Sequence, residues 1–451
     1  MTQKASRITI NTPVVFSDDL PGAVDVAIIG GGVMGVFTSL YLARMGKRVF
    51  LCEKGRIAGE QSSRNWGWIR QQGRDPAELP IMVKSLELWK EADRETGGQC
   101  GVTTCGTHYL ASSQSSLDEY HDWLPVAQEH GLDTLPLDRK DIAAMFSGQG
   151  NHDWLGGIVT PSDARGEPWR AVPAVARLAH ETGVLIREDC AVRALDVEAG
   201  RVTGIITEHG RIKCDQVVLA AGAWSSLFAR RHGINIPQLA VRGTVAQTAP
   251  LPEFFSSTAT DEELAIRRRD DGGYTLASAD RQAFFLGPDA FRHFSKYMHI
   301  LRQSWKEIDI KLSAPAGYPD AWGTDRRWSE TDVSPFEKMR VLEPVPDQKV
   351  ISKMRDHFES RFPLFGRPEI QSSWAGMIDA MPDIVPIIDR VPALPGLIIA
   401  TGLSGHGFGI GPGFGHVVCN LVADKQNAFD LQRFRFNRFT DGSTIRPGPA
   451  L

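Results

Sequence analysis

The sequence has little cysteine, no excess of basic charge and no long apolar run. Six cysteines occur in 451 residues, and only Cys100 and Cys105 lie close together, at a spacing that matches no standard zinc pair. We therefore expect no metal site and a reducing compartment. The 50 Lys and Arg residues are balanced by 54 Asp and Glu residues. This balance provides no positive field for nucleic acid or an anionic membrane, and it favours a small-molecule substrate.

The sequence also shows neither a targeting segment nor a membrane-spanning segment. A bilayer span needs about 18 or more consecutive apolar residues, and no such run occurs. Residues 1–19 are polar and lack the apolar core of a signal peptide, so we interpret them as an N-terminal extension of a cytoplasmic protein. With 42% hydrophobic and 23% charged residues, the chain should fold as a globular protein of two or three domains.

The first patterned segment predicts a strand, a helix and a second strand. Residues 24–29 are apolar and rich in β-branched side chains, residues 33–44 show helical spacing, and residues 48–53 form another apolar run. Helices are also expected over 77–97 and 170–182. Further predicted elements are a meander of 190–197, 202–207, 211–214 and 216–220, a hairpin of 264–269 and 274–277, a strand over 397–400 and a helix over 414–423.

The turn between the first strand and helix satisfies G-x-G-x-x-G. Gly30 suits the tight turn, Gly32 lets a pyrophosphate approach the backbone, and Gly35 permits close helix packing. The helix then begins at Val33 and Met34, where its amide groups face the phosphates. Glu53 ends the second strand, where it can accept hydrogen bonds from ribose hydroxyls and disfavours a 2′-phosphate. The pattern favours NAD or FAD over NADP.

Three further segments carry a resemblance to a known family. Residues 62–67 (SSRNWG), 220–225 (AAGAWS) and 405–408 (GHGF) resemble, in order and spacing, the D-amino-acid oxidase superfamily of flavoproteins. The chain looks most like the glycine and sarcosine oxidase branch over nearly its whole length. Within that branch, residues 64–73 resemble oxidases of N-substituted glycines, including iminodiacetate oxidase.

We predict an α/β fold with two domains. The first is a Rossmann-type, glutathione-reductase-like FAD-binding domain built from 20–98, 155–239 and 375–440. The second is an α+β substrate domain with an antiparallel sheet, built from 99–154 and 240–374, and the flavin should lie where the two meet. The alternating cations and aromatics of residues 433–439 predict a half-buried closing segment rather than an RNA-binding one.

The resemblance implies which residues contact FAD. The turn at Ala221 and Gly222 would pack beside the phosphates and ribose, and the loop 402–411 would lie against the flavin ring, where backbone amides stabilise negative charge. The expected contacts are Gly30, Gly32, Val33, Met34, Gly35, Glu53, Lys54, Ser62, Ser63, Arg64, Asn65, Trp66, Gly67, Trp68, Ala221, Gly222, Trp224, Gly402, Gly405, His406, Gly407, Phe408 and Gly409.

Two departures from the family pattern bear on the chemistry. Relatives with covalently bound flavin have a cysteine where this chain aligns Gly376, or a histidine near Asn65, so the resemblance implies FAD held without a covalent bond. The lysine that assists oxygen reduction would fall near Phe285, and a substrate-binding lysine is replaced by Gly409. Oxygen as the electron acceptor therefore has less support than FAD as the cofactor.

The substrate side of the site should hold a carboxylate and position a C–H bond. Arg70 aligns with the substrate arginine of sarcosine oxidases, and arginine grips a carboxylate through two hydrogen bonds. Arg74, Arg242 and Arg267 are further candidates, since a substrate with two carboxylates favours more than one cation. The aromatic residues Trp66, Trp68, Tyr274 and Trp322 could wall the cavity or lie in the core, and His406 could touch substrate, tune the flavin or pack beside its ring.

The resulting hypothesis is an FAD-dependent oxidase that acts on the C–N bond of a secondary amine or N-substituted glycine. The imine would hydrolyse to an amine plus an aldehyde or glyoxylate, and O₂ would become H₂O₂. Two alternatives stay open: a dehydrogenase that passes electrons to a quinone or protein carrier, and a flavin-binding subunit without turnover. An NAD dehydrogenase leaves residues 405–408 without a role.

Overall fold

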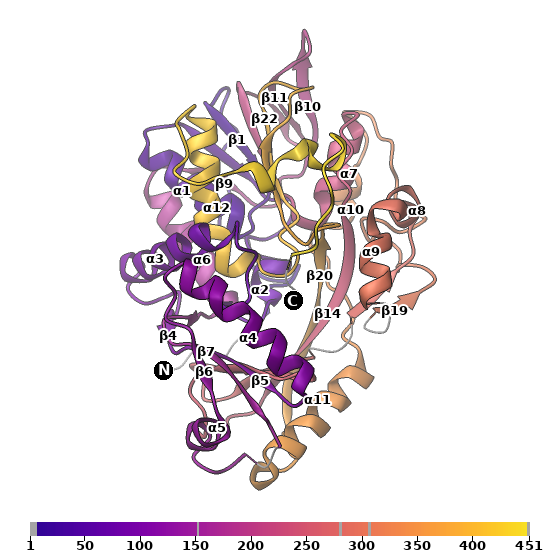
Figure 1. Ribbon diagram of the computed structural model, residues 1–451. Helices are drawn as coiled ribbons and strands as arrows, with labels where there is room; N and C mark the ends of the chain where they lie inside the picture. Colours follow the sequence, from indigo (N-terminus) through magenta and orange to yellow (C-terminus); the bar gives the residue numbers. More distant parts are fainter. Residues whose placement is uncertain (1–6, 151–152, 279–281, 305–307, 449–451) are drawn as a thin grey trace.

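The computed structural model describes residues 7–150, 153–278, 282–304 and 308–448, which form two large sheets with their covering helices (Figure 1). The first six residues of the predicted N-terminal extension lie outside these ranges. Among the described residues, no helix is both long and apolar enough to cross a bilayer. All six cysteines are free thiols.

The first large sheet has β1 near its centre. Its strand order is β21 (Ile387–Arg390), β22 (Leu397–Thr401), β13 (Gln216–Leu219), β1 (Val26–Ile29), β2 (Val49–Cys52) and β9 (Leu185–Arg187). All pairings are parallel except that of β21 with β22. A parallel sheet is covered on both faces, which explains why β1 and β2 are apolar at every position.

The two faces of this sheet bury alternate residues of β1. Val26 and Ile28 face a helical layer, which comprises α1 (Val33–Arg44), α3 (Leu79–Glu95), α6 (Pro168–Glu181) and α12 (Gly407–Val422). Ala27 and Ile29 face the other side. That side is covered by α7 (Ser225–Arg231) and by a small sheet of β10 (Val192–Glu198), β11 (Arg201–Thr207) and β12 (Gly210–Lys213).

The second large sheet is mainly antiparallel. Its order is β19 (Ile308–Lys311), β18 (Gln282–Phe285), β14 (Leu239–Thr248), β17 (Tyr274–Ser278), β16 (Leu264–Arg268), β15 (Thr258–Thr260), β5 (Thr107–Ala111), β7 (Gly156–Thr160) and β6 (Leu135–Leu137), with β20 (Ile370–Ala380) paired to β14. Two pairings, β5 with β15 and β18 with β19, are parallel. A separate core lies under α11 (Gln348–Arg361).

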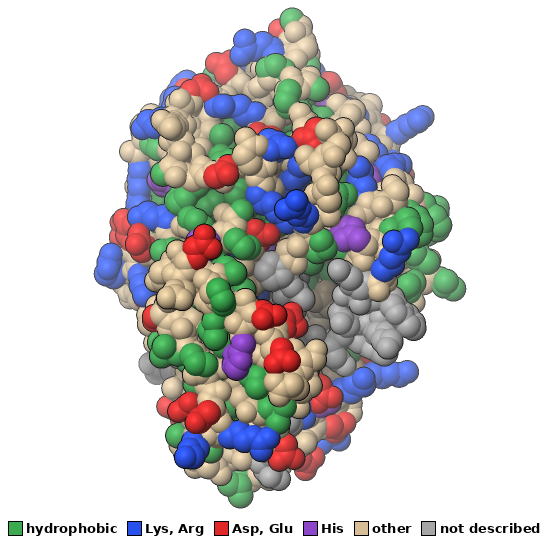
Figure 2. All heavy atoms as spheres, viewed as in Figure 1, with side chains coloured by type: hydrophobic (Ala, Val, Ile, Leu, Met, Phe, Trp, Pro, Cys, Tyr) green, Lys and Arg blue, Asp and Glu red, His purple; other side chains and the backbone are tan. Residues whose placement is uncertain are grey.

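Shorter elements join these layers. A small sheet of β3 (Trp68–Ile69), β8 (Ala164–Arg165) and β4 (Thr103–Thr104) links the segment after β2 to the segment before α6. The remaining α-helices of the described chain are α2 (Gln61–Arg64), α4 (Gln114–Glu129), α5 (Arg139–Met145), α8 (Pro288–Arg292), α9 (Phe294–Ser304) and α10 (Pro335–Lys338). The surface seen in Figure 2 carries both signs of charge interspersed, in agreement with the near balance of the sequence.

Most predicted elements are confirmed, and three predictions were wrong. The run 216–220 is not a fourth meander strand: it is β13, which pairs with β1 in the parallel sheet and is buried on both faces. The helix predicted over 414–423 begins at Gly407. Residues 433–439 are half-buried, as predicted, but they lie in two short 3₁₀ turns and not in an extended segment of period two.

The glycines of α12 explain why the first two turns of the helix could not be recognised from the sequence. A Cβ atom at Gly413 would lie 2.5 Å from the Ile81 carbonyl oxygen, and one at Gly411 would lie 2.7 Å from Val33. Glycine is a poor helix former in isolation, so its composition predicts a loop. Here the missing side chains let α12 pack closely on α1 and α3, and packing stabilises the helix.

The division into domains stays a prediction, although two strands do not follow it. Residues 156–160 were assigned to the FAD domain, but they form β7 within the second large sheet. The boundary at residue 375 falls inside β20, which continues without interruption from Ile370 to Ala380. The pairing of both strands is set by distant partners, which composition does not reveal.

Candidate functional site

One cavity runs from the end of β1, between the two large sheets, to the start of α12. Residues far apart in the sequence line it, and they come from both sheets. The lining includes Gly30, Gly32, Val33, Met34, Glu53, Lys54, Gln61, Ser62, Arg64, Asn65, Trp66, Trp68, Arg70, Arg74, Ala221, Gly222, Trp224, Thr244, Gln282, Phe336, Ile378, Asp379, Thr401, Leu403, Gly405, His406, Gly407 and Phe408.

The turn between β1 and α1 forms the first end of the cavity. Gly30 has φ +111°, and a Cβ atom there would lie 2.4 Å from the Ala220 carbonyl oxygen. A Cβ atom at Gly35 would lie 1.9 Å from the Gly30 oxygen. Gly32, by contrast, would meet only the Ser62 hydroxyl, at 3.1 Å. Two glycines are therefore required by protein packing, whereas Gly32 keeps the cavity beside the helix N-terminus open.

Glu53 lies at the end of β2 beside this turn. Its carboxylate accepts hydrogen bonds from the backbone amides of Gly31 (2.7 Å) and Gly55 (2.8 Å). Burial nevertheless raises the pKa of Glu53 to about 7, because Lys54 and the two amides only partly offset the loss of hydration. A buried carboxylate in this position gains from further hydrogen-bond donors, such as ribose hydroxyls.

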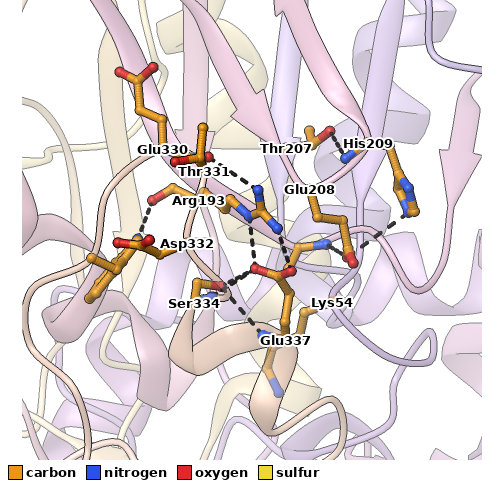
Figure 3. Close-up of polar contacts among 12 residues, drawn as sticks. Lys54, Arg193, Thr207, Glu208, His209, Glu330, Thr331, Asp332, Ser334 and Glu337 are labelled. Atoms are coloured by element: carbon orange, nitrogen blue, oxygen red, sulfur yellow. Dashed lines mark hydrogen bonds and ion pairs between the residues drawn. The ribbon is translucent and has the colours of Figure 1, made fainter.

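The short helix α10 contributes to the wall at this end of the cavity. Phe336 on α10 lines the cavity, and α10 is held by the paired hydrogen bonds of Arg193 to Glu337 (2.8 and 2.9 Å) and by its N-cap Ser334 (Figure 3). The Lys54 ammonium is also occupied: it contacts Glu60 at 2.6 Å and the Met339 carbonyl oxygen at 2.7 Å. Because these two oxygen atoms already bind the ammonium group, Lys54 contributes to the wall of the cavity.

The start of α12 forms the other end of the cavity. Gly405, His406, Gly407 and Phe408 line it, and the helix has no side-chain cap. Pro412 inside α12 has no amide hydrogen, so the Phe408 carbonyl oxygen is free to accept from the Trp89 indole at 2.9 Å. The helix N-terminus is therefore held by α3 and presents its amide groups toward the cavity.

Asp379 organises the loop before α12, and the sequence did not single it out. Its side chain accepts a hydrogen bond from the Gly402 amide at 2.9 Å, and its carbonyl oxygen accepts one from Ser404 at 2.9 Å. Burial raises the pKa of Asp379 to about 6, although the Gly402 amide opposes this shift. No local pattern marks this residue, because its partners lie more than 20 residues away.

Two buried arginines, Arg70 and Arg74, line the same cavity. They are 7% and 3% exposed, and within the described ranges neither forms an ion pair with a carboxylate. Arg74 donates to the Arg70 carbonyl oxygen at 3.2 Å, while Arg70 donates to the Gln72 carbonyl oxygen and lies over the Tyr109 ring. Burial and the neighbouring Arg70 charge lower the pKa of Arg74 to about 9. Buried, unpaired cations of this kind favour an anionic ligand.

His406 contacts a buried carboxylate that sequence reasoning missed. Its Nε2 atom lies 3.0 Å from a Glu78 carboxylate oxygen, and the two side chains are 5% and 2% exposed. Glu78 precedes α3, and no signal in the sequence links it to a histidine 328 positions later. The Glu78 and His406 pair lies next to the two arginines, since Arg74 and Arg70 both influence the titration of His406.

Four of the predicted substrate residues do not line the cavity. Arg242 pairs with Asp347 at 3.1 Å, and Arg267 forms a buried ion pair with Glu167 at 2.9 Å. Tyr274 is fully buried in the core under α11, where its hydroxyl donates to the Phe255 carbonyl oxygen at 2.8 Å. Trp322 is 57% exposed at the surface. These placements correct the sequence-based expectation, because a residue type on a strand does not reveal which face it occupies.

Most of the residues expected to contact FAD do line the cavity, and Trp66 and Trp68 lie there with their rings 5.4 Å apart. Five of the expected residues do not line the cavity. They are Gly35, Ser63, Gly67, Gly402 and Gly409. Residues of the second sheet that the sequence did not single out, Thr244, Gln282 and Ile378, complete the lining.

The ion pair of Arg267 predicts a structural effect rather than a catalytic one. Arg267→Leu would leave the buried Glu167 carboxylate with only the more distant Arg165, at 3.6 Å, as an ionic partner, so we expect a loss of about 3 kcal/mol in the free energy of unfolding. Urea unfolding monitored by tryptophan fluorescence would measure this. The double variant Arg267→Leu/Glu167→Leu should recover most of the stability. Normal stability of the single variant would contradict this interpretation.

Comparisons with known proteins identify the family and the relatives of this chain. Residues 25–421 match the model of a family described as FAD dependent oxidoreductase. The human mitochondrial sarcosine dehydrogenase is 23% identical over 96% of this chain and 43% of its own length. The sarcosine oxidase subunit beta of Arthrobacter sp is 24% identical, with 92% of each chain covered.

A solved structure is similar over almost the whole fold. The L-amino acid deaminase from Proteus myxofaciens, in complex with anthranilate, superimposes with a TM-score of 0.90 and 26% identity, covering 96% of this chain and 97% of that one. The chain spans less than half the length of the first curated relatives that it matches.

Proposed function

Because the chain belongs to the family of FAD-dependent oxidoreductases, we propose that it oxidises the C–N bond of a small amine that carries a carboxylate. The favoured substrates are N-substituted glycines such as iminodiacetate or sarcosine. The observation that carries this proposal is the pair of buried arginines, Arg70 and Arg74, without carboxylate partners in the described chain. The cytoplasmic location stays a prediction.

The cavity fits FAD at both ends. The open side of Gly32, the uncapped start of α1 and the Glu53 carboxylate suit the pyrophosphate and ribose, while the start of α12 suits the flavin ring. Gly376 and Asn65 line the cavity where some relatives attach their flavin covalently, so we propose non-covalent binding. Bound there, FAD would supply a two-electron acceptor for the substrate C–H bond.

The protein's own residues would position the substrate. Arg70 and Arg74 would hold the carboxylate groups, and Trp66 and Trp68 would limit the access of water. Loss of two electrons and two protons from the amine, as a hydride from the α-carbon and a proton from nitrogen, yields an imine, which water splits into an amine and a carbonyl product. With iminodiacetate, these products are glycine and glyoxylate, and reduction of O₂ would give H₂O₂.

A second candidate substrate class is the L-amino acids, favoured by the likeness to the Proteus myxofaciens deaminase. Both classes share the carboxylate and the C–H bond next to nitrogen, so both suit the arginine pair. The electron acceptor is a separate alternative. Phe285 and Gly409 stand where some relatives have lysines, which supports a dehydrogenase that uses a quinone or protein carrier.

Anaerobic reduction of the flavin tests the activity directly. We expect the visible absorption of the purified holoenzyme to bleach when iminodiacetate or sarcosine is added without oxygen. Rapid recovery in air with release of H₂O₂ would support an oxidase, and slow recovery would support a dehydrogenase. Bleaching by L-amino acids alone would favour the second substrate class. If no carboxylate-bearing amine bleaches the flavin, the proposed activity is wrong.

The pKa of Glu53 predicts that FAD binding depends on pH. Ribose hydroxyls would donate to the ionised carboxylate, so binding must lower a pKa that stands at about 7 without FAD. FAD affinity should therefore fall as the pH drops below about 7, by up to tenfold per pH unit. Fluorescence titration of the apoprotein with FAD at pH 6 and 8 would measure this. The Glu53→Gln variant should bind more weakly, with no pH dependence in this range.

A further inference from the structure

Arg70 and Arg74 lie in a short turn, residues 70–74, which we call the arginine turn. It follows β3 and reverses at Gly73, which has φ +69°. The Arg70 guanidinium donates to the Gln72 carbonyl oxygen, and Nε of Arg74 donates to the Arg70 carbonyl oxygen at 3.2 Å. Because both acceptors belong to the turn itself, the direction of the two guanidinium groups depends on its backbone.

Both arginines keep hydrogen-bond donors with accessible surface. Within the described chain, Arg70 forms hydrogen bonds only through Nη1, and Arg74 only through Nε. Their other nitrogen atoms have no partner there but are not sealed off from solvent, and both side chains line the cavity. A Cβ atom at Gly409, near the start of α12, would lie 3.5 Å from Nη2 of Arg74. A substrate carboxylate would bind to these free donors.

Asp163 holds the arginine turn through its backbone. The antiparallel pairing of β3 with β8 places Asp163, which precedes β8, beside Arg70. Asp163 is fully buried and is not part of the cavity lining. Its carboxylate accepts hydrogen bonds from the backbone amides of Gln71 at 2.7 Å and Gln72 at 3.3 Å. One side chain therefore fixes two consecutive amides of the turn.

Asp163 is itself anchored beside the second large sheet. Its carbonyl oxygen accepts hydrogen bonds from the amides of Cys105 (3.0 Å) and Gly106 (2.9 Å), which directly precede β5. The Gln71 side chain donates both to the Asp163 carboxylate at 3.1 Å and to the Ser162 hydroxyl at 2.8 Å. These contacts tie the position of the arginine turn to that sheet.

Asp163 also supplies a negative charge near the arginines without occupying their donors. Burial raises the pKa of Asp163 to about 6, although the amide hydrogen bonds and the charge of Arg70 oppose this, so the carboxyl group is ionised at neutral pH. Burial lowers the pKa of Arg74, and the charges of Glu78 and Asp163 oppose that shift. A carboxylate bonded directly to the guanidinium groups would instead compete with the substrate.

We propose that Asp163 is a positioning residue for the substrate carboxylate: it fixes the arginine turn so that Arg70 and Arg74 keep their free donors available to the ligand. Its hydrogen bonds go to two backbone amides, which leaves those donors unoccupied. The inference rests on the proposed function and adds to it a residue outside the cavity lining that sets the affinity for the carboxylate. It requires no contact between Asp163 and the substrate.

The variant Asp163→Asn tests this role in the holoenzyme. Asparagine keeps the size of the side chain, but only its oxygen atom can accept, so one amide of the turn loses its partner. We expect KM for iminodiacetate to rise by about tenfold or more while kcat stays within about threefold, because uniform binding of the carboxylate is lost. Thiodiacetate has sulfur in place of nitrogen and cannot form an imine. Its dissociation constant, measured through the flavin spectrum, should rise by the same factor.

Asp261→Asn is a matched control outside the cavity. Asp261 is also buried, and its carboxylate accepts hydrogen bonds from the backbone amides of Glu263 and Leu264, both at 2.9 Å. Both variants should unfold at lower urea concentration, but Asp261→Asn should leave KM and the thiodiacetate dissociation constant within about twofold of wild type. The proposal is overturned if Asp163→Asn keeps both constants at their wild-type values, or if Asp261→Asn raises them equally.

Hydrogen exchange of the unaltered holoenzyme tests the proposal even where Asp163→Asn fails to fold. Buried, paired amides exchange slowly, so the Gln71 and Gln72 amides should be protected, and rapid exchange of both would overturn the proposal. The outcomes also separate this inference from the proposed function. If no amine reduces the flavin but Asp163→Asn still weakens thiodiacetate binding, the proposed activity is rejected and the positioning role stands.

Discussion

Arg74→Leu should raise the KM for a carboxylate-bearing substrate by roughly 30- to 1,000-fold. Removing one member of a buried, hydrogen-bonded charge pair costs about 2–4 kcal/mol, and each factor of ten corresponds to about 1.4 kcal/mol. The same change at Arg70 should act similarly, since both guanidinium groups line the cavity without a carboxylate partner in the described residues. Steady-state kinetics with iminodiacetate would measure the effect.

The stability of the substrate-free protein should not decrease in the Arg74→Leu variant. A buried cation without a partner costs free energy, so Arg74→Leu is expected to keep or raise the unfolding temperature. Arg242→Leu is a matched control, because Arg242 was predicted on the same grounds but pairs with Asp347 outside the cavity. Its KM should stay within about twofold of wild type. An unchanged KM for both Arg70→Leu and Arg74→Leu would remove the carboxylate site from this cavity.

Gly32→Val should abolish FAD binding while leaving the fold intact. The backbone at Gly32 is extended (φ −76°, ψ −179°), and an added Cβ would meet only the Ser62 hydroxyl. A valine side chain there would occupy the space beside the start of α1 that suits a pyrophosphate. Loss of two charge-assisted hydrogen bonds, at about 1.5–3 kcal/mol each, predicts at least about 100-fold weaker binding.

Purified Gly32→Val should therefore be colourless and have a wild-type circular dichroism spectrum. Gly35→Ala makes the useful contrast, since its Cβ would lie 1.9 Å from the Gly30 oxygen and should impair folding itself. Gly22→Val, with no heavy atom within 4 Å of its Cβ, should keep both the fold and the yellow colour. A yellow Gly32→Val protein would show that the cofactor does not approach this turn.

Local segments of the sequence were enough to predict the nucleotide end of the site. The strand 24–29, the glycine pattern and Glu53 lie within about 30 residues of one another, and their geometry follows from one strand, one turn and one helix. Short segments of this kind constrain their own backbone, so the prediction can be made without knowledge of the rest of the fold.

The substrate end could not be predicted in the same way. Arg74, Arg242 and Arg267 were further candidates on the same grounds, and only packing separates Arg74, which lines the cavity, from the two arginines that pair with Asp347 and Glu167. The side of a strand that faces a cavity depends on its register with distant neighbours. A one-residue change of register would reverse it.

The sequence by itself therefore determined the family resemblance, the cofactor class and the turn that we propose for the nucleotide, because these depend on residues that are close along the chain. Only the tertiary structure decided that Glu78 meets His406, that Asp379 holds the loop before α12, and that the glycines after residue 406 form a helix. Each of these depends on contacts between residues far apart in the sequence, whose free energy exists only once the chain has folded.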